Sequence, residues 1–196
     1  ISAMMELGGG RYEPSFRGLT SIYYNCFVEN DYSDIWYYYE GKPLLYGESD
    51  YENSLKYLEK DDKAEMDILE MLKGFFTFRG NGGRNNYKDE ATGSNNWHWL
   101  DNFPQVQRNK DASGRAEAVA LGTAINQSTL IGGSQTGVFS DQYNKGRGFS
   151  EVFKEDYRDI GKRQAYFFRE QAALVLEAAP KFVLIDGWNE WIAGRN

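Results

Sequence analysis

Five short apolar runs recur along the chain, and they occupy residues 1–5, 43–46, 75–78, 118–124 and 182–185. Apolar runs of this length without a polar alternation are typical of strands buried on both faces. Two longer stretches, 54–73 and 160–179, carry apolar residues at mostly helical spacing, and Pro180 ends the second. Because parallel neighbours need long crossovers, this alternation of strands and helices predicts a parallel α/β sheet.

Two long segments without periodicity, 80–114 and 126–151, each follow directly on a predicted strand. At the carboxyl end of a parallel sheet or barrel, such loops build the active site. The pattern predicts a (β/α)8 barrel of the TIM type, as one partial catalytic domain over 1–196. Five strands do not close a barrel that typically needs about 250 residues. We therefore expect strands missing before residue 1 and after residue 196, and an open five-stranded sheet is the alternative.

Composition narrows the class of partner. The 196 residues carry 29 acids against 22 bases, a net charge of -7, which disfavours nucleic acid and anionic lipid as partners. One cysteine excludes an internal disulfide, and one histidine leaves little room for a metal site, so we expect no metal and no cofactor, with an oxygen-ligated calcium left open. No apolar run reaches the roughly 18 residues of a membrane span, and no signal peptide opens the chain.

Aromatic residues make up 16% of the chain, and many lie in polar stretches rich in glycine and asparagine. Aromatic rings with one solvated edge suit sugars, whose C–H faces stack on them, although rings can also simply anchor large loops. No glycine-rich dinucleotide or phosphate loop follows any predicted strand. The sequence thus favours a carbohydrate over a nucleotide.

Polar residues come just after each predicted strand, where a shared pocket would collect them. They are Glu6, Gly47 with Glu48, Arg79, Asn126 with Gln127, and Glu190. Such a set can hold several hydroxyl groups and place two carboxyls about a bond, but it offers no nucleophilic serine and histidine pair. Glu190 lies between Trp188 and Trp191, where apolar rings should raise a carboxyl pKa towards that of a general acid. Alternatively, Asn189 and Glu190 cap a following helix.

A glycosidase of the common kind needs a second carboxylate, about 5 Å from the first for retention or about 6.5 to 9.5 Å for inversion. Asp101 and Asp141 lie among aromatics in the two long loops, and Glu6 is a third candidate. Each of these acids also has a structural or substrate-orienting interpretation. Asp186, just before Gly187, is expected to point into the barrel or to orient a neighbour.

The other polar residues of the loops admit plainer interpretations. His98 stands in a Trp-His-Trp run, where a packed, hydrogen-bonded ring is the simplest expectation. The loops are also more basic than the whole molecule, which would suit a carboxylated or sulfated glycan unless these charges are merely solvated. The basic residues are Arg79, Arg84, Lys88, Arg108, Lys110, Arg115, Lys145 and Arg147.

Four spaced motifs carry a resemblance to a known group of proteins. They are Asp-Ile-Trp-Tyr-Tyr-Tyr-Glu-Gly-Lys-Pro-Leu-Leu at 34–45, Phe-Phe-Thr-Phe-Arg at 75–79, Trp-His-Trp-Leu-Asp-Asn-Phe-Pro-Gln at 97–105 and Trp-Asn-Glu-Trp at 188–191. Together they resemble a bacteroidete-type glycoside-hydrolase-like family of (β/α)8 proteins, related to glycoside hydrolase family 99 and the WbsX-like polysaccharide proteins. The resemblance covers most of the chain in the same order, and only the last motif is specific by itself.

The chain also departs from these families. Family 99 has a second glutamate three positions after the first, where this chain has Ala193, so only Glu190 carries over. A stretch that ends in Gln-His-Pro in similar proteins here has Asn126, Gln127 and Ser128, so any role of that histidine is absent. The resemblance implies a bacterial protein that is secreted, periplasmic or at the cell surface, its leader absent from this chain. Endo-acting fucanases are a further similar group.

These observations predict a glycoside hydrolase that is endo-acting on a polysaccharide, an anionic or sulfated fucan being one substrate that suits the basic loops. Its catalytic residues would be Glu190 with Asp141 or Asp101. The expected sugar-binding residues are Glu6, Arg79, Trp97, Trp99, Asn126, Gln127, Trp188, Asn189 and Trp191. The alternatives are a catalytically inactive glycan-binding barrel and a polysaccharide-biosynthesis protein that acts on nucleotide sugars.

Overall fold

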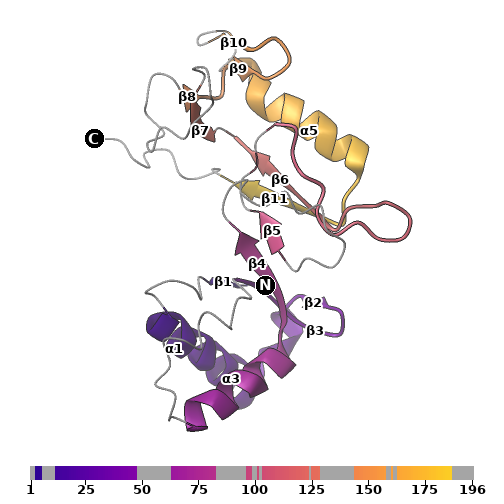
Figure 1. Ribbon diagram of the computed structural model, residues 1–196. Coiled ribbons are helices and arrows are strands. Elements are labelled where there is room, and N and C mark those ends of the chain that lie inside the picture. The colour runs from indigo at the N-terminus through magenta and orange to yellow at the C-terminus, as the bar shows by residue number, and fades with distance from the viewer. Residues whose placement is uncertain are drawn as a thin grey trace. The chain divides into compact units, whose positions relative to one another are not determined.

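The computed structural model describes residues 3–5, 12–47, 63–82, 96–98, 101, 103–123, 125–128, 144–157, 160 and 163–186. By its internal contacts the chain divides into two compact units, Ile1–Gly82 and Gly83–Asn196. Both units mix helices and strands (Figure 1). The expectation of one catalytic domain stays a prediction.

Three parallel strands form the sheet of the first unit: β1 (Ala3–Met5), β3 (Lys42–Gly47) and β4 (Thr77–Gly82). β3 pairs in parallel with β1 on one side and with β4 on the other. The strands predicted at 1–5 and 43–46 are confirmed. The strand predicted at 75–78 is partly wrong, because Phe75 ends a helix and the strand begins at Thr77 and continues to Gly82.

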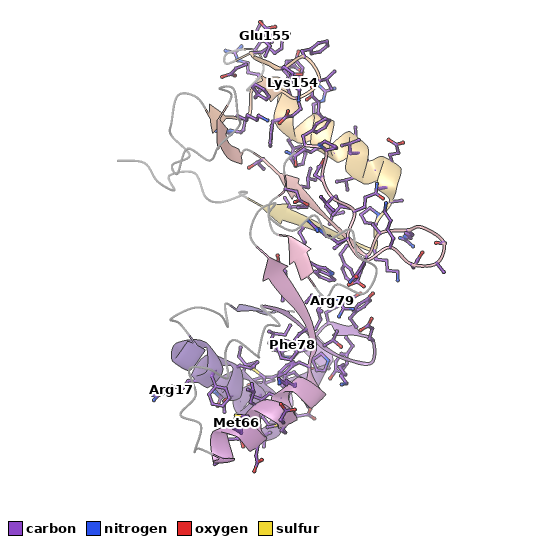
Figure 2. The ribbon with its side chains drawn as sticks, in the orientation of Figure 1. Arg17, Met66, Phe78, Arg79, Lys154 and Glu155 are labelled. Atoms are coloured by element: carbon purple, nitrogen blue, oxygen red, sulfur yellow. The ribbon has the colours of Figure 1, made fainter. Side chains whose placement is uncertain are left out.

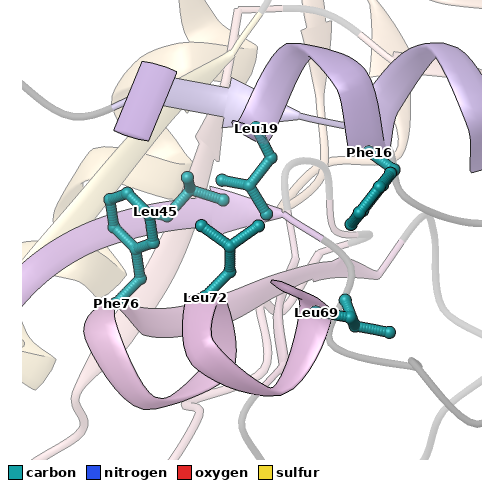
Figure 3. Close-up of a cluster of buried hydrophobic side chains, with 6 residues drawn as sticks. All are labelled: Phe16, Leu19, Leu45, Leu69, Leu72 and Phe76. Atoms are coloured by element: carbon teal, nitrogen blue, oxygen red, sulfur yellow. The ribbon is translucent and has the colours of Figure 1, made fainter. Parts of the chain in front are cut away.

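Two helices cover one face of this sheet. They are α1 (Tyr12–Tyr23), extended by the π-helical turn η2 (Tyr24–Glu29), and α3 (Lys63–Phe75). α3 overlaps the helical stretch expected at 54–73 and ends two residues beyond it, whereas α1 was not predicted. Figure 3 shows the six buried side chains where helices and sheet meet. This six-residue core consists of Phe16, Leu19, Leu45, Leu69, Leu72 and Phe76.

A short hairpin precedes the central strand. After the 3-10 turn η3 (Ser33–Ile35), strand β2 (Tyr38–Tyr39) pairs antiparallel with β3. Its two turn residues, Glu40 and Gly41, have φ values of 55° and 79°. Left-handed backbone at both central positions matches the right-handed twist of a two-residue hairpin, and glycine adopts it without steric cost.

In the second unit, β6 (Ala118–Gly122) and β11 (Phe182–Asp186) pair in parallel over their whole length. Between them in sequence comes α5 (Tyr166–Ala178), and the strands predicted at 118–124 and 182–185 are confirmed. α5 places Val175 against Val119 and Leu121 of β6. This strand, helix, strand order is that of a β/α unit (Figure 1).

The C-terminus of α5 matches the predicted helix end. Ala179 adopts a left-handed conformation with φ 43°, and its N–H donates to the carbonyl of Val175. Pro180 follows and cannot continue a helix. Arg115 Nε donates to the carbonyl of Ala179 at 2.8 Å, so a cation satisfies an acceptor at the negative end of the helix.

The long segments expected to lack periodicity contain several short strands. They are β5 (Asn96–His98), most of β7 (Ile125–Ser128), β8 (Asn144–Lys145) and β9 (Phe149–Ser150), whereas β10 (Glu155–Asp156) follows the second segment. Within the described ranges the strands form small sheets and no closed barrel, so the (β/α)8 barrel stays a prediction. Every helix described is too short or too polar to cross a lipid bilayer.

Candidate active site

The carboxyl edge of the β6–β11 pair is where the predicted catalytic motif begins. In the register of the two strands, Asp186 at the end of β11 lies opposite Gly122 at the end of β6. Glu190 follows Asp186 by four residues, and Asn126 follows Gly122 by four. Because parallel strands end at the same edge, Asp186 and Gly122 lie side by side there.

A buried glutamine fixes the end of β6. Gln171 of α5 is fully buried, and its Oε1 accepts a hydrogen bond from the N–H of Gly122 at 3.0 Å. Gln105 Nε2 donates to Oε1 of Gln171 at 3.1 Å and to its backbone carbonyl at 3.2 Å. The sequence analysis missed Gln171. Its signal was available, because Gln171 falls on the apolar face of the predicted helix, between Phe168 and Val175.

Beyond Gly122 the chain enters a two-stranded ribbon with a bulge. β7 pairs antiparallel with β8, with Ile125 opposite Lys145 and Ser128 opposite Asn144. Two residues on β7, Asn126 and Gln127, thus lie between positions whose partners are adjacent on β8. Bulges of this kind bend a strand and redirect its side chains, and they are frequent beside active sites. Both bulged residues are predicted sugar ligands.

Four charged residues clasp this ribbon to α5, and we call them the Glu151 clasp: Lys145, Glu151, Lys154 and Glu170. The Glu151 carboxylate, with its side chain 0% exposed, pairs with Lys145 Nζ at 2.8 Å and with Lys154 Nζ at 2.7 Å. Glu170 of α5 accepts hydrogen bonds from the backbone N–H groups of Glu151 at 2.6 Å and of Val152 at 3.2 Å. The sequence analysis missed Glu151 and Glu170, whose setting no local pattern marks.

Two predicted site residues of the 97–105 motif are packed inside the second unit. Trp97 is 2% exposed, and its Nε1 donates to Glu117 Oε1 at 2.7 Å. Asp101 is 1% exposed, with its Oδ1 3.6 Å from Arg108 Nη2, and its Oδ2 accepts from the N–H of Val106. A sugar needs an exposed ring face or an accessible carboxylate, so this burial argues against the predicted roles of Trp97 and Asp101.

Arg79 lies inside β4 rather than just after a strand, because the strand extends to Gly82. Its guanidinium is buried and donates to Glu40 Oε1 at 2.9 Å and to the carbonyl of Phe78 at 3.0 Å (Figure 2). The guanidinium carbon also lies 5.1 Å from the ring centre of Tyr39. Glu40 precedes β3, so the Arg79 side chain reaches towards the amino end of that strand and not towards its carboxyl end.

For the remaining predicted site residues the structure describes the backbone alone or does not describe the residue. For Asn126 and Gln127 it describes the backbone, and the same holds for Asp186 and His98. Seven predicted site residues lie outside the described residues: Glu6, Trp99, Asp141, Trp188, Asn189, Glu190 and Trp191.

A cavity of about 440 Å³ opens elsewhere in the second unit. It lies between the C-terminal half of α5 and the segment before β6, and Gln105, Gln107, Val119 and Glu177 are among its lining residues. α5 runs back from the end of β6, so this cavity is near the start of the strand. Parallel α/β proteins place their chemistry at the opposite, carboxyl ends, and none of the predicted site residues lines this cavity.

Two surface groups have shifted pKa values, and neither belongs to the predicted site. The hydroxyl of Ser113, donating to Asp111, lowers the pKa of that carboxyl below its ordinary 3.8, and the N–H groups of Ser113 and Arg115 act in the same direction. A hydrogen bond to the Glu155 carboxylate raises the pKa of Tyr157 above 10.0.

Comparison of the chain with protein-family models, with curated proteins and with solved structures finds no match. The argument for function therefore rests on the strand ends and the motifs that follow them.

Proposed function

We propose that this protein is a glycoside hydrolase, endo-acting on a polysaccharide, with Glu190 as its acid/base. The observation that carries the proposal is the parallel β6–β11 pair, which ends at Asp186, with Gly187 between it and the Trp-Asn-Glu-Trp motif. A carboxyl that follows a parallel strand lies where α/β enzymes hold their catalytic groups. The neighbouring Trp188 and Trp191 would supply rings for sugar stacking and an apolar setting that favours the protonated form of a carboxyl.

Asp141 is our choice for the second carboxylate. It comes three residues before β8, whose partner β7 follows the end of β6, so its segment leads into the ribbon at the same strand end. Asp101 is set aside because its carboxylate is buried against Arg108. Glu190 would protonate the glycosidic oxygen while Asp141 attacks the anomeric carbon or activates water, according to their separation. Asn126, Gln127 and Asn189 would hold sugar hydroxyls.

The charges of the second unit favour a neutral polysaccharide over a sulfated one. Several basic loop residues are already matched within the protein: Arg108 by Asp101, Lys145 by Glu151, and Arg115 by carbonyls at the end of α5. A cation paired in this way gains less from a sulfate than one facing solvent. We therefore propose a neutral glycan as the first substrate class, with a sulfated fucan second.

The test is Glu190→Gln, which keeps the size of the side chain and removes its acid. Loss of general acid catalysis should lower the release of reducing ends by about 10²- to 10⁴-fold, while polysaccharide affinity stays near that of the wild type. The wild type and the variant are compared on α-mannan and on sulfated fucan. Glu177→Gln, the same change at an exposed position of α5, is the matched control.

The second candidate is a glycan-binding protein without catalysis, and Ala193 favours it, because family 99 has its second glutamate at that position. It predicts polysaccharide binding by the wild type without reducing-end release, and no effect of Glu190→Gln on either. Cleavage by the wild type that survives Glu190→Gln would contradict the assignment of Glu190.

A further inference from the structure

The bulge at Asn126 and Gln127 has a feature that the proposed function does not use. β8 offers consecutive residues, Asn144 and Lys145, to positions on β7 that are three apart. A short ribbon with a bulge can shift its register at small cost, since few hydrogen bonds hold it. Something outside the ribbon must fix Asn126 and Gln127 if they are to meet a sugar in one geometry.

The Glu151 clasp supplies that fixed point. Lys145 lies opposite Ile125, the residue just before the bulge, and its Nζ is 2.8 Å from Glu151 Oε1. Both side chains are largely withdrawn from water, at 14% and 0% exposed, which strengthens a charge-assisted hydrogen bond. Lys145 also lies over the ring of Phe149, 5.3 Å from its centre. The ammonium at the base of the bulge is therefore held from two directions.

Glu151 is itself anchored to the main body of the second unit. Glu170 of α5 accepts from the backbone of Glu151 and, at 2.6 Å, from the hydroxyl of Ser150. α5 packs on β6 through Val175, and β6 leads into β7. The contacts thus form a closed circuit from β6 through α5 and Glu151 to Lys145 and back to the bulge. Such a circuit resists displacement of the ribbon better than one pair would.

Lys154 differs from Lys145 although it binds the same carboxylate. Its side chain is 64% exposed, it comes three residues after Glu151, and it lies at the β9–β10 hairpin (Figure 2). A pair between close neighbours in sequence whose cation is mostly exposed contributes little and fixes no distant segment. Lys154 pairs with the second carboxylate oxygen of Glu151 and so helps to neutralise its buried charge. Lys145 pairs with the first oxygen and connects Glu151 to β7.

We propose that Glu151 is a positioning residue: through Lys145 it fixes the bulged Asn126 and Gln127 at the end of β6, where they bind the sugar. The role in sugar binding rests on the proposed function, and the fixing of the bulge does not. Two measurements separate these parts.

The first measurement is amide hydrogen exchange of the free protein. Glu151→Leu and Lys145→Met should each raise exchange of residues 125–128 by about tenfold or more, because each removes a charge-assisted hydrogen bond. Exchange in β11 should stay unchanged. Lys154→Met is the matched control and should leave 125–128 as in the wild type, while Lys145→Arg should restore protection. Equal exchange of 125–128 in the wild type and in Lys145→Met would overturn the proposal, even if Glu151→Leu fails to fold.

The second measurement is kinetic, on α-mannan and on sulfated fucan. Lys145→Met should raise KM about tenfold with kcat nearly unchanged, because the bulge binds sugar and takes no part in bond breaking. Combined with Asn126→Ala it should cost no more than Asn126→Ala alone, whereas a general loss of stability would add. Additive losses, or a fall in kcat alone, would contradict the positioning role. If the variants show the predicted change in exchange but the wild type neither binds nor cleaves these glycans, the role of the Glu151 clasp is supported and the proposed function is rejected.

Discussion

The two units of this chain bury different kinds of side chain. The first unit encloses a core of leucine and phenylalanine side chains, with Leu19, Leu45 and Leu72 almost fully buried. The apolar cluster of the second unit is built around Ala116, Val119, Leu121 and Val175. Among its described residues, the largest fully buried side chains are those of Arg108, Phe167 and Gln171, and two of these three are polar.

The two kinds of buried group differ in how strictly they fix the positions of the segments that they join. Apolar burial stabilises without strong direction, so the first unit should lose little stability when core substitutions conserve the buried volume. Buried polar groups need partners at defined distances and angles, and they hold a chain in one arrangement. In the second unit these groups lie around the segment before β6, the end of β6 and the β7–β8 ribbon, and the last two of these parts bear on the proposed site.

The largest effect on stability is expected at the buried ion pair. Arg108→Met leaves Asp101 charged and buried without its guanidinium, which should lower the free energy of unfolding of the second unit by about 3 to 5 kcal/mol. Replacing both residues, as Asp101→Leu with Arg108→Met, should be less destabilising than the single change. Urea unfolding followed by hydrogen exchange in β6 measures both. A double variant less stable than Arg108→Met would contradict this interpretation.

The apolar core of the first unit should respond by a similar or smaller amount. Leu72→Ala opens a cavity at a fully buried position, so we expect a loss of about 2 to 5 kcal/mol in the unfolding of this unit. Leu176→Ala, at a leucine 80% exposed on α5, is the control and should change stability by less than about 0.5 kcal/mol. Similar losses for the two variants would show that burial is not the cause.

The smallest effect concerns the surface loop that precedes β6. Ser113→Ala removes the hydroxyl that donates to Asp111, so the lowered pKa of that carboxyl should rise towards 3.8. A carboxyl whose folded pKa is depressed adds stability above its unfolded pKa and loses it as the pH falls through the folded value. Ser113→Ala should therefore lower the stability at pH values above about 3.8, and the difference from the wild type should vanish as the pH falls through the lowered folded pKa. Carboxyl NMR titration measures the shift, and Ser113→Thr, which keeps a hydroxyl, should not show it.

Periodicity was enough to predict much of the backbone. All five apolar runs contain described strands, α5 lies within the second expected helical stretch, and α3 overlaps the first and ends two residues beyond it. The main miss was α1, whose apolar positions Phe16, Leu19 and Tyr23 do have helical spacing, but over few turns and beside glycine-rich sequence. The hairpin before β3 had only Gly41 as its signal. Phe75 and Phe76 were wrongly assigned to a strand, because a short apolar run is compatible with a strand and with a helix end alike.

The polar contacts of the candidate site could not be predicted in the same way. Gln105 and Gln171 are 66 residues apart, and Trp97 reaches Glu117 across 20. Such pairs depend on how distant segments meet, which no local pattern encodes. For the same reason Asp101 and Trp97 suggested a sugar site from their aromatic surroundings, whereas the fold uses them inside the unit.

The most direct test of the account is a crystal structure of Glu190→Gln with a bound oligosaccharide. The account predicts a sugar ring at the carboxyl edge of β6 and β11, with the residue-190 side chain facing the carboxylate of Asp141 at about 5 to 9.5 Å. Contact of that sugar with the bulge at Asn126 would link the clasp to the site. A residue-190 side chain in bulk solvent, with no carboxylate within about 10 Å, would contradict the hydrolase proposal.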